Sequence, residues 1–212
     1  MRMKLRAWEI MSLFRIDNKI LSTQKCYRAM LWALCMPGSL QKVGFAGNET
    51  DISSGVPRPV ALMSQTLLDE QVSVAASDMD SEFWLDEIIA ATGARKAGID
   101  EADYILASSV PRLVELRSVK QGTLLSPEDG ATLIIWLSDV IEGNSGMIEI
   151  SGPGVEDSAT LYVSPAMFSL MKHRTAIQFE YPLGFDLFAV GSDGYLLGLP
   201  RTSSVKVVTE KG

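Results

Sequence analysis

The residues with the clearest chemical potential lie near the end of the chain, around Asp186 and Arg201. Asp186 lies between Gly184 and a strand that should be buried, where an ionised carboxylate needs a partner. Arg201, just past the next expected strand, can supply that partner. Thr202 and Ser203 add hydroxyl groups beside it, a combination that suits an anion and is also ordinary at the start of a strand. Two interpretations stay open: a structural Asp–Arg pair or turn-capping Asp, or a pair that lines a ligand or subunit pocket.

A second candidate segment is the turn formed by Gly152, Pro153 and Gly154. It resembles a fragment of a dinucleotide-binding fingerprint, but the third glycine is absent and the proline removes an N–H donor from the loop. A phosphate-binding P-loop would need a Gly-rich turn that ends in Lys-Ser or Lys-Thr, and the sequence has none. We therefore interpret the segment as a tight turn, and we keep Gly152 and Gly154 as candidate ligand or interface residues.

The histidine and cysteine content argues against a metal centre. His173 is the sole histidine, and Cys26 and Cys35 are the two cysteines. Their separation of nine residues in one expected helix is about 13 Å along the axis, too far for a disulfide, so we expect reduced structural thiols. A Cys–His pair remains open if either thiol meets His173 in space. The sequence predicts no catalytic residue, no metal and no cofactor.

Composition limits the class of partner. The chain has 212 residues, is 47% hydrophobic and carries a net charge of −7, which argues against a nucleic-acid interface. Residues 1–42 are nevertheless basic, and could dock on the acidic remainder or on a partner, or form a solvated terminus. Glu9 and Arg15 interrupt the apolar run that a signal peptide would need, and no run is long enough to span a membrane. We expect a cytoplasmic protein that binds neither nucleic acid nor membrane.

Hydrophobic patterns and turn signals divide the chain into alternating helices and strands. A continuous apolar run over 131–137 predicts a central strand covered on both faces, and Gly191–Gly194 predicts the turn of an antiparallel hairpin. We expect one three-layer α/β/α domain with a mixed sheet over residues 21–212, preceded by a basic extension over residues 1–20. The expected helices are 22–36, 60–68, 78–93, 109–117 with Pro111 in its first turn, and 165–174. The expected strands are 72–76, 103–107, 131–137, 147–150, 160–163, 185–190, 195–199 and 205–208.

Several strings, in order across residues 27–208, resemble the PhnH family of bacterial carbon-phosphorus (C-P) lyase subunits. The strings are Tyr27-Arg28 through Met36-Pro37-Gly38, Gly130-Ala131-Thr132-Leu133, Ile150-Ser151-Gly152-Pro153-Gly154-Val155, Pro182-Leu183-Gly184-Phe185-Asp186-Leu187, and Pro200-Arg201-Thr202.

This resemblance implies a fold like the large domain of pyridoxal-phosphate-dependent transferases, without the cofactor-binding residues. It also implies a homodimer and an accessory, not independently catalytic, role beside the G, I and J components of the lyase core complex. That complex converts phosphonates and ATP to ribose-linked phosphonate intermediates before C-P cleavage, and its radical and iron-sulfur chemistry belongs to another subunit. Two alternatives remain: a phosphonate- or nucleotide-binding protein or transferase with a site near Asp186 and Arg201, or an unrelated α/β interaction module.

Overall fold

The computed structural model describes residues 7–45, 52, 55–141 and 146–208, with side chains from residue 18 onward. Five α-helices, one 3-10 helix and ten strands lie in these residues. In chain order they are α1 (Ala7–Cys35), β1 (Leu40–Lys42), α2 (Arg58–Leu67), β2 (Ser73–Ala76), α3 (Met79–Thr92), β3 (Arg95–Lys96), β4 (Tyr104–Ala107), α4 (Leu113–Ser118), η1 (Pro127–Asp129), β5 (Thr132–Leu137), β6 (Met147–Ser151), β7 (Ala159–Tyr162), α5 (Pro165–Thr175), β8 (Asp186–Gly191), β9 (Tyr195–Leu199) and β10 (Ser204–Val208).

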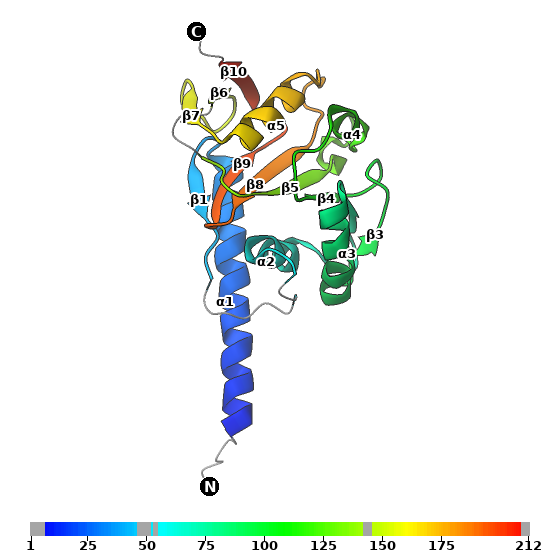
Figure 1. The fold of residues 1–212 in the computed structure, drawn as a ribbon, viewed down its shortest axis with the longest axis vertical. Coiled ribbons are helices and arrows are strands. Elements are labelled where there is room, and N and C mark those ends of the chain that lie inside the picture. Colours follow the sequence, from blue (N-terminus) through cyan, green and yellow to red (C-terminus); the bar gives the residue numbers. More distant parts are fainter. Residues whose placement is uncertain (1–6, 46–51, 53–54, 142–145, 209–212) are drawn as a thin grey trace.

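A seven-stranded mixed sheet forms the centre of the molecule, with the strand order β1-β9-β8-β5-β4-β2-β3 (Figure 1). Strands β3, β2, β4, β5 and β8 are parallel, whereas β9 and β1 are antiparallel additions at one side. The predicted hairpin is confirmed, since Gly194 has a positive φ of 82° in the turn between β8 and β9. The mixed sheet of the sequence prediction is therefore present.

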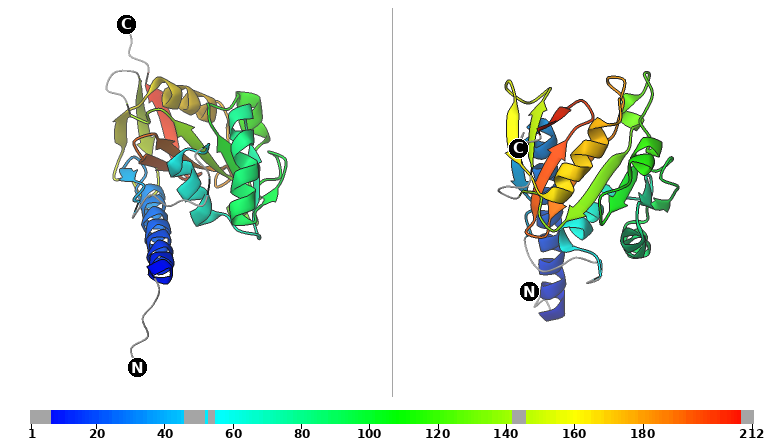
Figure 2. Two further views of the ribbon diagram at one scale, coloured as in Figure 1. Left: turned by 60° about the horizontal axis from the view of Figure 1, so that its bottom comes forward. Right: turned by 45° about the horizontal axis from the view of Figure 1, so that its top comes forward.

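Strand β5 shows why helices must cover both faces of this sheet. Successive residues of a strand point to opposite faces of the sheet, so the residues of β5 alternate between two hydrophobic cores. Leu133 and Ile135 pack with α4 and α5, whereas Ile134 and Trp136 pack with α1, α2 and α3. The two views of Figure 2 show these helix groups on opposite sides of the sheet. The three-layer α/β architecture expected from the apolar run over 131–137 is confirmed.

Three of the expected strands form a sheet of their own. Strand β6 pairs antiparallel with β7 and with β10, in the order β10-β6-β7. The small sheet packs on the α5 side, where Ile148 and Ile150 of β6 are fully buried. Its alternating strand β6 has one buried and one partly exposed face, as expected for a sheet covered on one side only.

The N-terminal helix is longer than predicted. Helix α1 runs without a break from Ala7 to Cys35, through the region interpreted as an extension, and its first turns lead away from the sheet (Figure 1). Among the described residues, no helix combines the length and the apolar character that crossing a membrane requires.

Other boundaries also differ from the prediction. Strands β1 and β3, of three and two residues, were not predicted. Pro111 does not lie in the first turn of a helix, because α4 begins at Leu113. The proline disfavours a helical conformation at Val110, and the Glu115 carboxylate fixes the later start by accepting a 2.8 Å hydrogen bond from the Arg112 main-chain N–H.

Candidate functional site

Asp186 and Arg201 meet, as the sequence suggested, and their contact is extensive. Asp186 is the first residue of β8, and Arg201 follows β9 after Pro200. The Asp186 carboxylate accepts hydrogen bonds from Arg201 N at 2.7 Å, Nε at 3.2 Å and Nη2 at 2.5 Å. The two side chains are only 17% and 13% exposed, so this pair lies largely out of water.

The same guanidinium also holds the loop that leads into β5. Arg201 Nη1 donates to the Pro127 carbonyl, and Nη2 lies 3.4 Å from the Gly130 carbonyl. Gly130 permits this approach, because a Cβ at that position would stand 2.3 Å from the Gly184 carbonyl oxygen and 2.7 Å from Arg201 Nη1. Arg201 therefore joins three chain segments through four hydrogen bonds of its guanidinium group.

Gly152 and Gly154 are positions of close packing. A Cβ on Gly154, whose φ is 85°, would lie 2.2 Å from the Cys35 carbonyl oxygen at the end of α1. A Cβ on Gly152, whose φ is 126°, would lie 3.1 Å from the Thr202 carbonyl oxygen. The turn is thus held between α1 and the segment after Arg201, and only Gly152 approaches the neighbourhood of the Asp186–Arg201 pair.

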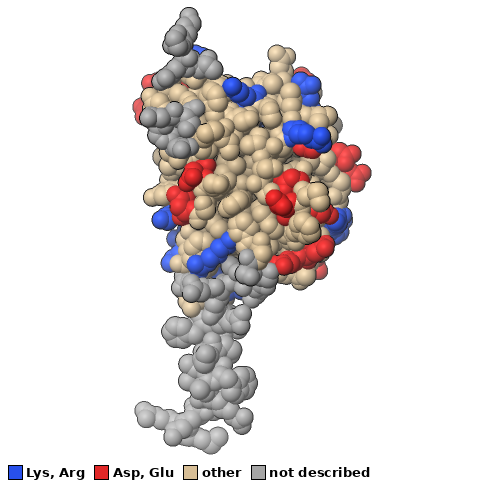
Figure 3. All heavy atoms as spheres, in the orientation of Figure 1, with Lys and Arg blue, Asp and Glu red and all other residues tan. Residues whose placement is uncertain are grey.

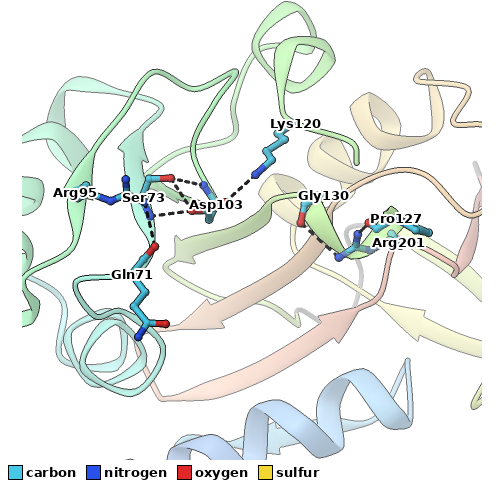
Figure 4. A network of polar contacts seen from close by, with 8 residues as sticks. All are labelled: Gln71, Ser73, Arg95, Asp103, Lys120, Pro127, Gly130 and Arg201. Carbon is cyan, nitrogen blue, oxygen red and sulfur yellow. Dashed lines mark hydrogen bonds and ion pairs between the residues drawn. The ribbon is translucent and has the colours of Figure 1, made fainter. Parts of the chain in front are cut away.

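A second ion pair lies at the same end of the parallel strands, where these strands begin. The Asp103 carboxylate accepts hydrogen bonds from Lys120 Nζ at 2.8 Å and from the Ser73 N and Oγ atoms at 2.9 and 2.7 Å. Figure 4 shows this network beside the contact of Arg201 with the loop at Gly130. Both carboxylates stand where parallel strands begin, Asp103 before β4 and Asp186 in β8, whereas ligands of open α/β sheets bind beyond the carboxyl ends. Their placement favours a structural role.

Arg174 is a residue that the sequence analysis missed. It lies on α5, is 5% exposed and donates to the main-chain oxygens of Ser203 at 3.2 Å and Pro200 at 3.1 Å. Its Nε and the Ser203 hydroxyl are buried and have no hydrogen-bond partner among the described residues. Burial lowers the pKa of Arg174 to about 10, although the charge of Asp186 opposes that shift.

The sequence carried a signal for this arginine. Arg174 follows Met167, Leu170 and Met171 by seven, four and three residues, which places it on the buried face of the helix. A cavity of about 350 Å³ lies beside it. Arg174, Arg201, Thr202, Ser203, Phe179 and Tyr181 contribute to its lining.

The Cys–His pairing left open by the sequence does not form. Cys26 is buried in the core on the α1 side of the sheet, and His173 lies on α5 on the other side, where its Nδ1 is 2.9 Å from the Pro111 carbonyl oxygen. Burial raises the pKa of the Cys26 thiol to about 11, against a smaller lowering by a hydrogen bond with Thr66. Cys35 is exposed, so a structural role in the core applies to Cys26 and not to Cys35.

Charged side chains of both signs are mixed on the face of the molecule that Figure 3 shows. On the face shown in Figure 3, the described Lys and Arg side chains are scattered among acidic and uncharged residues. Within the described part of the chain, no group of three or more His, Cys, Asp or Glu side chains is arranged to hold a metal ion.

Comparison with known proteins covers almost the whole chain. The family model described as "Bacterial phosphonate metabolism protein (PhnH)" matches residues 15–206. A protein of Stutzerimonas stutzeri, named "Putative C-P lyase subunit protein HtxG", is 27% identical over 184 residues, which are 87% of this chain and 86% of the relative. The matched region includes both ion pairs, the Gly152–Gly154 turn and Arg174. The chain belongs to the PhnH family of bacterial phosphonate metabolism proteins.

Proposed function

We propose that this protein is an accessory subunit of a cytoplasmic C-P lyase complex that degrades phosphonates. The observation that carries the proposal is the family match over residues 15–206, together with a relative of similar length named as a putative C-P lyase subunit. In this function the protein assembles with the G, I and J components that convert phosphonates and ATP to ribose-linked intermediates. It supports that chemistry by binding to other subunits.

The surface of α1 supports a role in assembly. Contiguous apolar side chains on the surface of a protein commonly mark an interaction site. Cys26, Met30 and Ala33 of α1 are buried against the sheet, yet large apolar residues also occupy its outer side. The exposed residues are Ile20, Leu21, Tyr27, Leu31 and Trp32, with Met36 just after the helix and Leu40 on the neighbouring edge strand β1. We propose that this outer side of α1 is covered in the assembled complex, by a second copy of the chain or by another subunit.

Growth on methylphosphonate as sole phosphorus source tests the function. Deletion of the gene should abolish growth on methylphosphonate and leave growth on inorganic phosphate unchanged, and restoring the wild-type chain should rescue it. Co-purification of the tagged chain with the other core subunits tests assembly directly. Unchanged growth in a strain without a redundant copy, or a stoichiometric mixture of subunits that does not associate, would contradict the proposal.

The substitution Leu31→Glu locates the interface. Leu31 is 48% exposed on α1, and Val114→Glu on α4, where the valine is 65% exposed, is the matched control. Leu31→Glu should reduce co-purification where another subunit covers α1, or lower the oligomeric mass of the free protein where a second copy covers it, because a charge in an apolar interface is costly to desolvate. Val114→Glu should change neither. Equal behaviour of the two variants would remove α1 from the interface.

Arg174 favours a second candidate function, the binding of a phosphonate or nucleotide. A buried guanidinium is normally paired with an anion, and arginine is well suited to binding phosphate-like oxygens. Arg174 donates to two main-chain oxygens and contacts no described carboxylate, while its side chain and that of Arg201 both line the 350 Å³ cavity. The unpartnered Ser203 hydroxyl adds a further hydrogen-bonding group there.

Calorimetric titration of the isolated protein with ATP and with methylphosphonate tests this candidate. Arg174→Met should abolish the binding of either ligand, because it removes the charge and keeps much of the apolar side chain. Lys172→Met is the matched control, since Lys172 is exposed on the same helix and does not line the cavity. No heat with either ligand, from protein whose fold is verified by circular dichroism, would exclude a site that works without partner subunits.

A further inference from the structure

The loop between α4 and β5 carries two leucines at its tip. Leu124 is 62% exposed and Leu125 is 96% exposed, and neither belongs to the two hydrophobic cores. A single exposed apolar residue is common on protein surfaces. Here two adjacent leucines lie largely in water, so their burial contributes little to the folding of the free chain.

The backbone of this tip does not require leucine. Thr123 and Ser126 exchange main-chain hydrogen bonds of 3.1 Å in each direction, so Leu124 and Leu125 are the two central residues of a tight turn. Such turns favour Gly, Pro, Asn, Asp and Ser. Among the described residues other than glycine, Asp157 alone has a positive φ, so both leucines have ordinary backbone angles that polar residues adopt equally well. The two apolar side chains therefore need an explanation outside the fold of this chain.

Hydrogen bonds hold the loop on both sides of the tip. On the side that leads to the tip, Gly184 N donates to the Gln121 carbonyl at 3.0 Å. On the returning side, Arg201 contacts the carbonyls of Pro127 and Gly130 (Figure 4). A segment that is already held in place loses little conformational freedom on binding, and this raises affinity. The two leucines are therefore presented to a partner in a fixed position.

The charges beside the tip are acidic. Glu128 and Asp129 follow it in the 3-10 helix η1, and both are exposed. Lys120 is the basic residue of the segment 119–131, and its Nζ is paired with the Asp103 carboxylate at 2.8 Å. Acidic groups beside an apolar tip repel an anionic lipid surface and attract a protein surface that carries Lys or Arg. A second copy of this chain, with a net charge of −7, matches the tip less well.

We propose that Leu124 and Leu125 insert into an apolar pocket with a basic rim on another subunit of the complex. Insertion removes the two side chains from water, which drives association, while Glu128 and Asp129 lie against the rim. The proposal rests on the assembly proposed above, and it names a contact that does not involve the outer side of α1.

Co-purification of the tagged full-length chain with the other core subunits, followed by dilution of the complex to measure its dissociation, tests the tip. The double variant Leu124→Ser, Leu125→Ser should weaken association at least about tenfold, because burial of one leucine side chain typically changes an equilibrium by this factor. The matched control is Met79→Ser, Phe83→Ser, which replaces two apolar residues of α3 that are 78% and 72% exposed and should leave association unchanged. Equal effects of the two variants would overturn this proposal and leave the assembly in place, whereas a wild-type chain that recovers no subunit would overturn both.

Charge reversal tests the basic rim. The double variant Glu128→Lys, Asp129→Lys should weaken association at low salt, and the difference from wild type should shrink at high salt, because salt screens exposed charges. An unchanged or stronger association at low salt would contradict a basic rim on the partner.

Two further measurements test other occupants of the tip. The oligomeric mass of the free chain should be the same in the wild type and in the Leu124→Ser, Leu125→Ser variant, because the tip does not bind a second copy. Neither protein should sediment with phosphatidylglycerol vesicles. A lower mass of the variant, or vesicle binding that is lost in the variant, would assign the tip to a second copy or to a membrane and overturn the proposal.

Discussion

The carboxylate of Asp186 accepts three hydrogen bonds from a single residue, Arg201, through the main-chain N, Nε and Nη2 atoms. Because the same guanidinium reaches the carbonyls of Pro127 and Gly130, this ion pair connects the start of β8, the end of β9 and the loop before β5. The pair therefore has a structural role, because it joins these three segments.

Arg201→Ala should lower the free energy of unfolding by roughly 2–4 kcal/mol, because it leaves the Asp186 carboxylate without a cation in a mostly buried position. Urea denaturation measures the loss. Arg112→Ala is the control, since the Arg112–Glu115 pair is exposed, with 78% of the arginine side chain accessible, and such pairs contribute little. Equal effects of the two substitutions would mean that the Asp186–Arg201 pair is not a main tie between segments.

Gly154→Ala should destabilise the protein more than Gly194→Ala. The two glycines have similar φ angles of 85° and 82°, so the backbone strain of an alanine is about 1–2 kcal/mol in each. Only at Gly154 would the added Cβ also meet a main-chain oxygen, at 2.2 Å, whereas its nearest neighbour at Gly194 lies at 3.8 Å. Thermal denaturation of both variants gives the comparison, and a smaller loss at Gly154 would show that the turn moves freely away from α1.

The two cysteines should differ in reactivity. Cys35 is exposed, whereas Cys26 is buried and its pKa is raised to about 11 by desolvation, so its thiol stays protonated near neutral pH. Titration with Ellman's reagent at pH 8 should modify one thiol per chain rapidly and the second only in denaturant. Cys35→Ser should abolish the rapid phase. Rapid modification of Cys26 in that variant would contradict the buried position.

Asp78 should make stability depend on acid pH. Burial raises the pKa of Asp78, but hydrogen bonds from Ser108 and Ser81 outweigh this effect and hold the pKa below its usual value. The stabilisation by the ionised carboxylate is therefore complete above the unfolded-state pKa of about 3.9 and is lost as the pH falls through the lower folded-state pKa. Asp78→Asn should reduce stability at pH 7 and flatten its decline below pH 4, measured by urea denaturation across pH. An unchanged slope would show that Asp78 contributes little to acid unfolding.

The sequence predicted the parts of the fold that local patterns determine. The apolar run at Ile134 and its neighbours indicated a strand covered on both faces, and the glycines before Tyr195 indicated the hairpin. The division of strands between two sheets depends on contacts between distant segments, such as Ser204 with Ser151, which no local pattern encodes. Strands as short as β1 and β3 carry no periodicity that could reveal them.

The sequence predicted only part of the candidate site, for the same reason. The Asp186–Arg201 pair followed from the rule that a buried charge needs a partner, and the structure shows the contact. Arg201 also binds carbonyl groups of the loop before β5, and a cavity lies beside Arg201 and Arg174. The residues that form these contacts belong to segments far apart in the chain. A second cavity is lined by Phe83 and Trp84 of α3 and by Trp136 of β5, residues that only the topology of the fold brings together.

The two edge strands of the large sheet affect how the protein contacts other proteins. Edge strands offer unpaired N–H and C=O groups to other chains, and proteins commonly limit this hazard by making such strands short. Strand β1 has three residues and β3 has two, so the sheet presents very little free backbone at either side. Pairing of these edges with strands of other chains is therefore limited, and contacts with partner proteins are made by side chains.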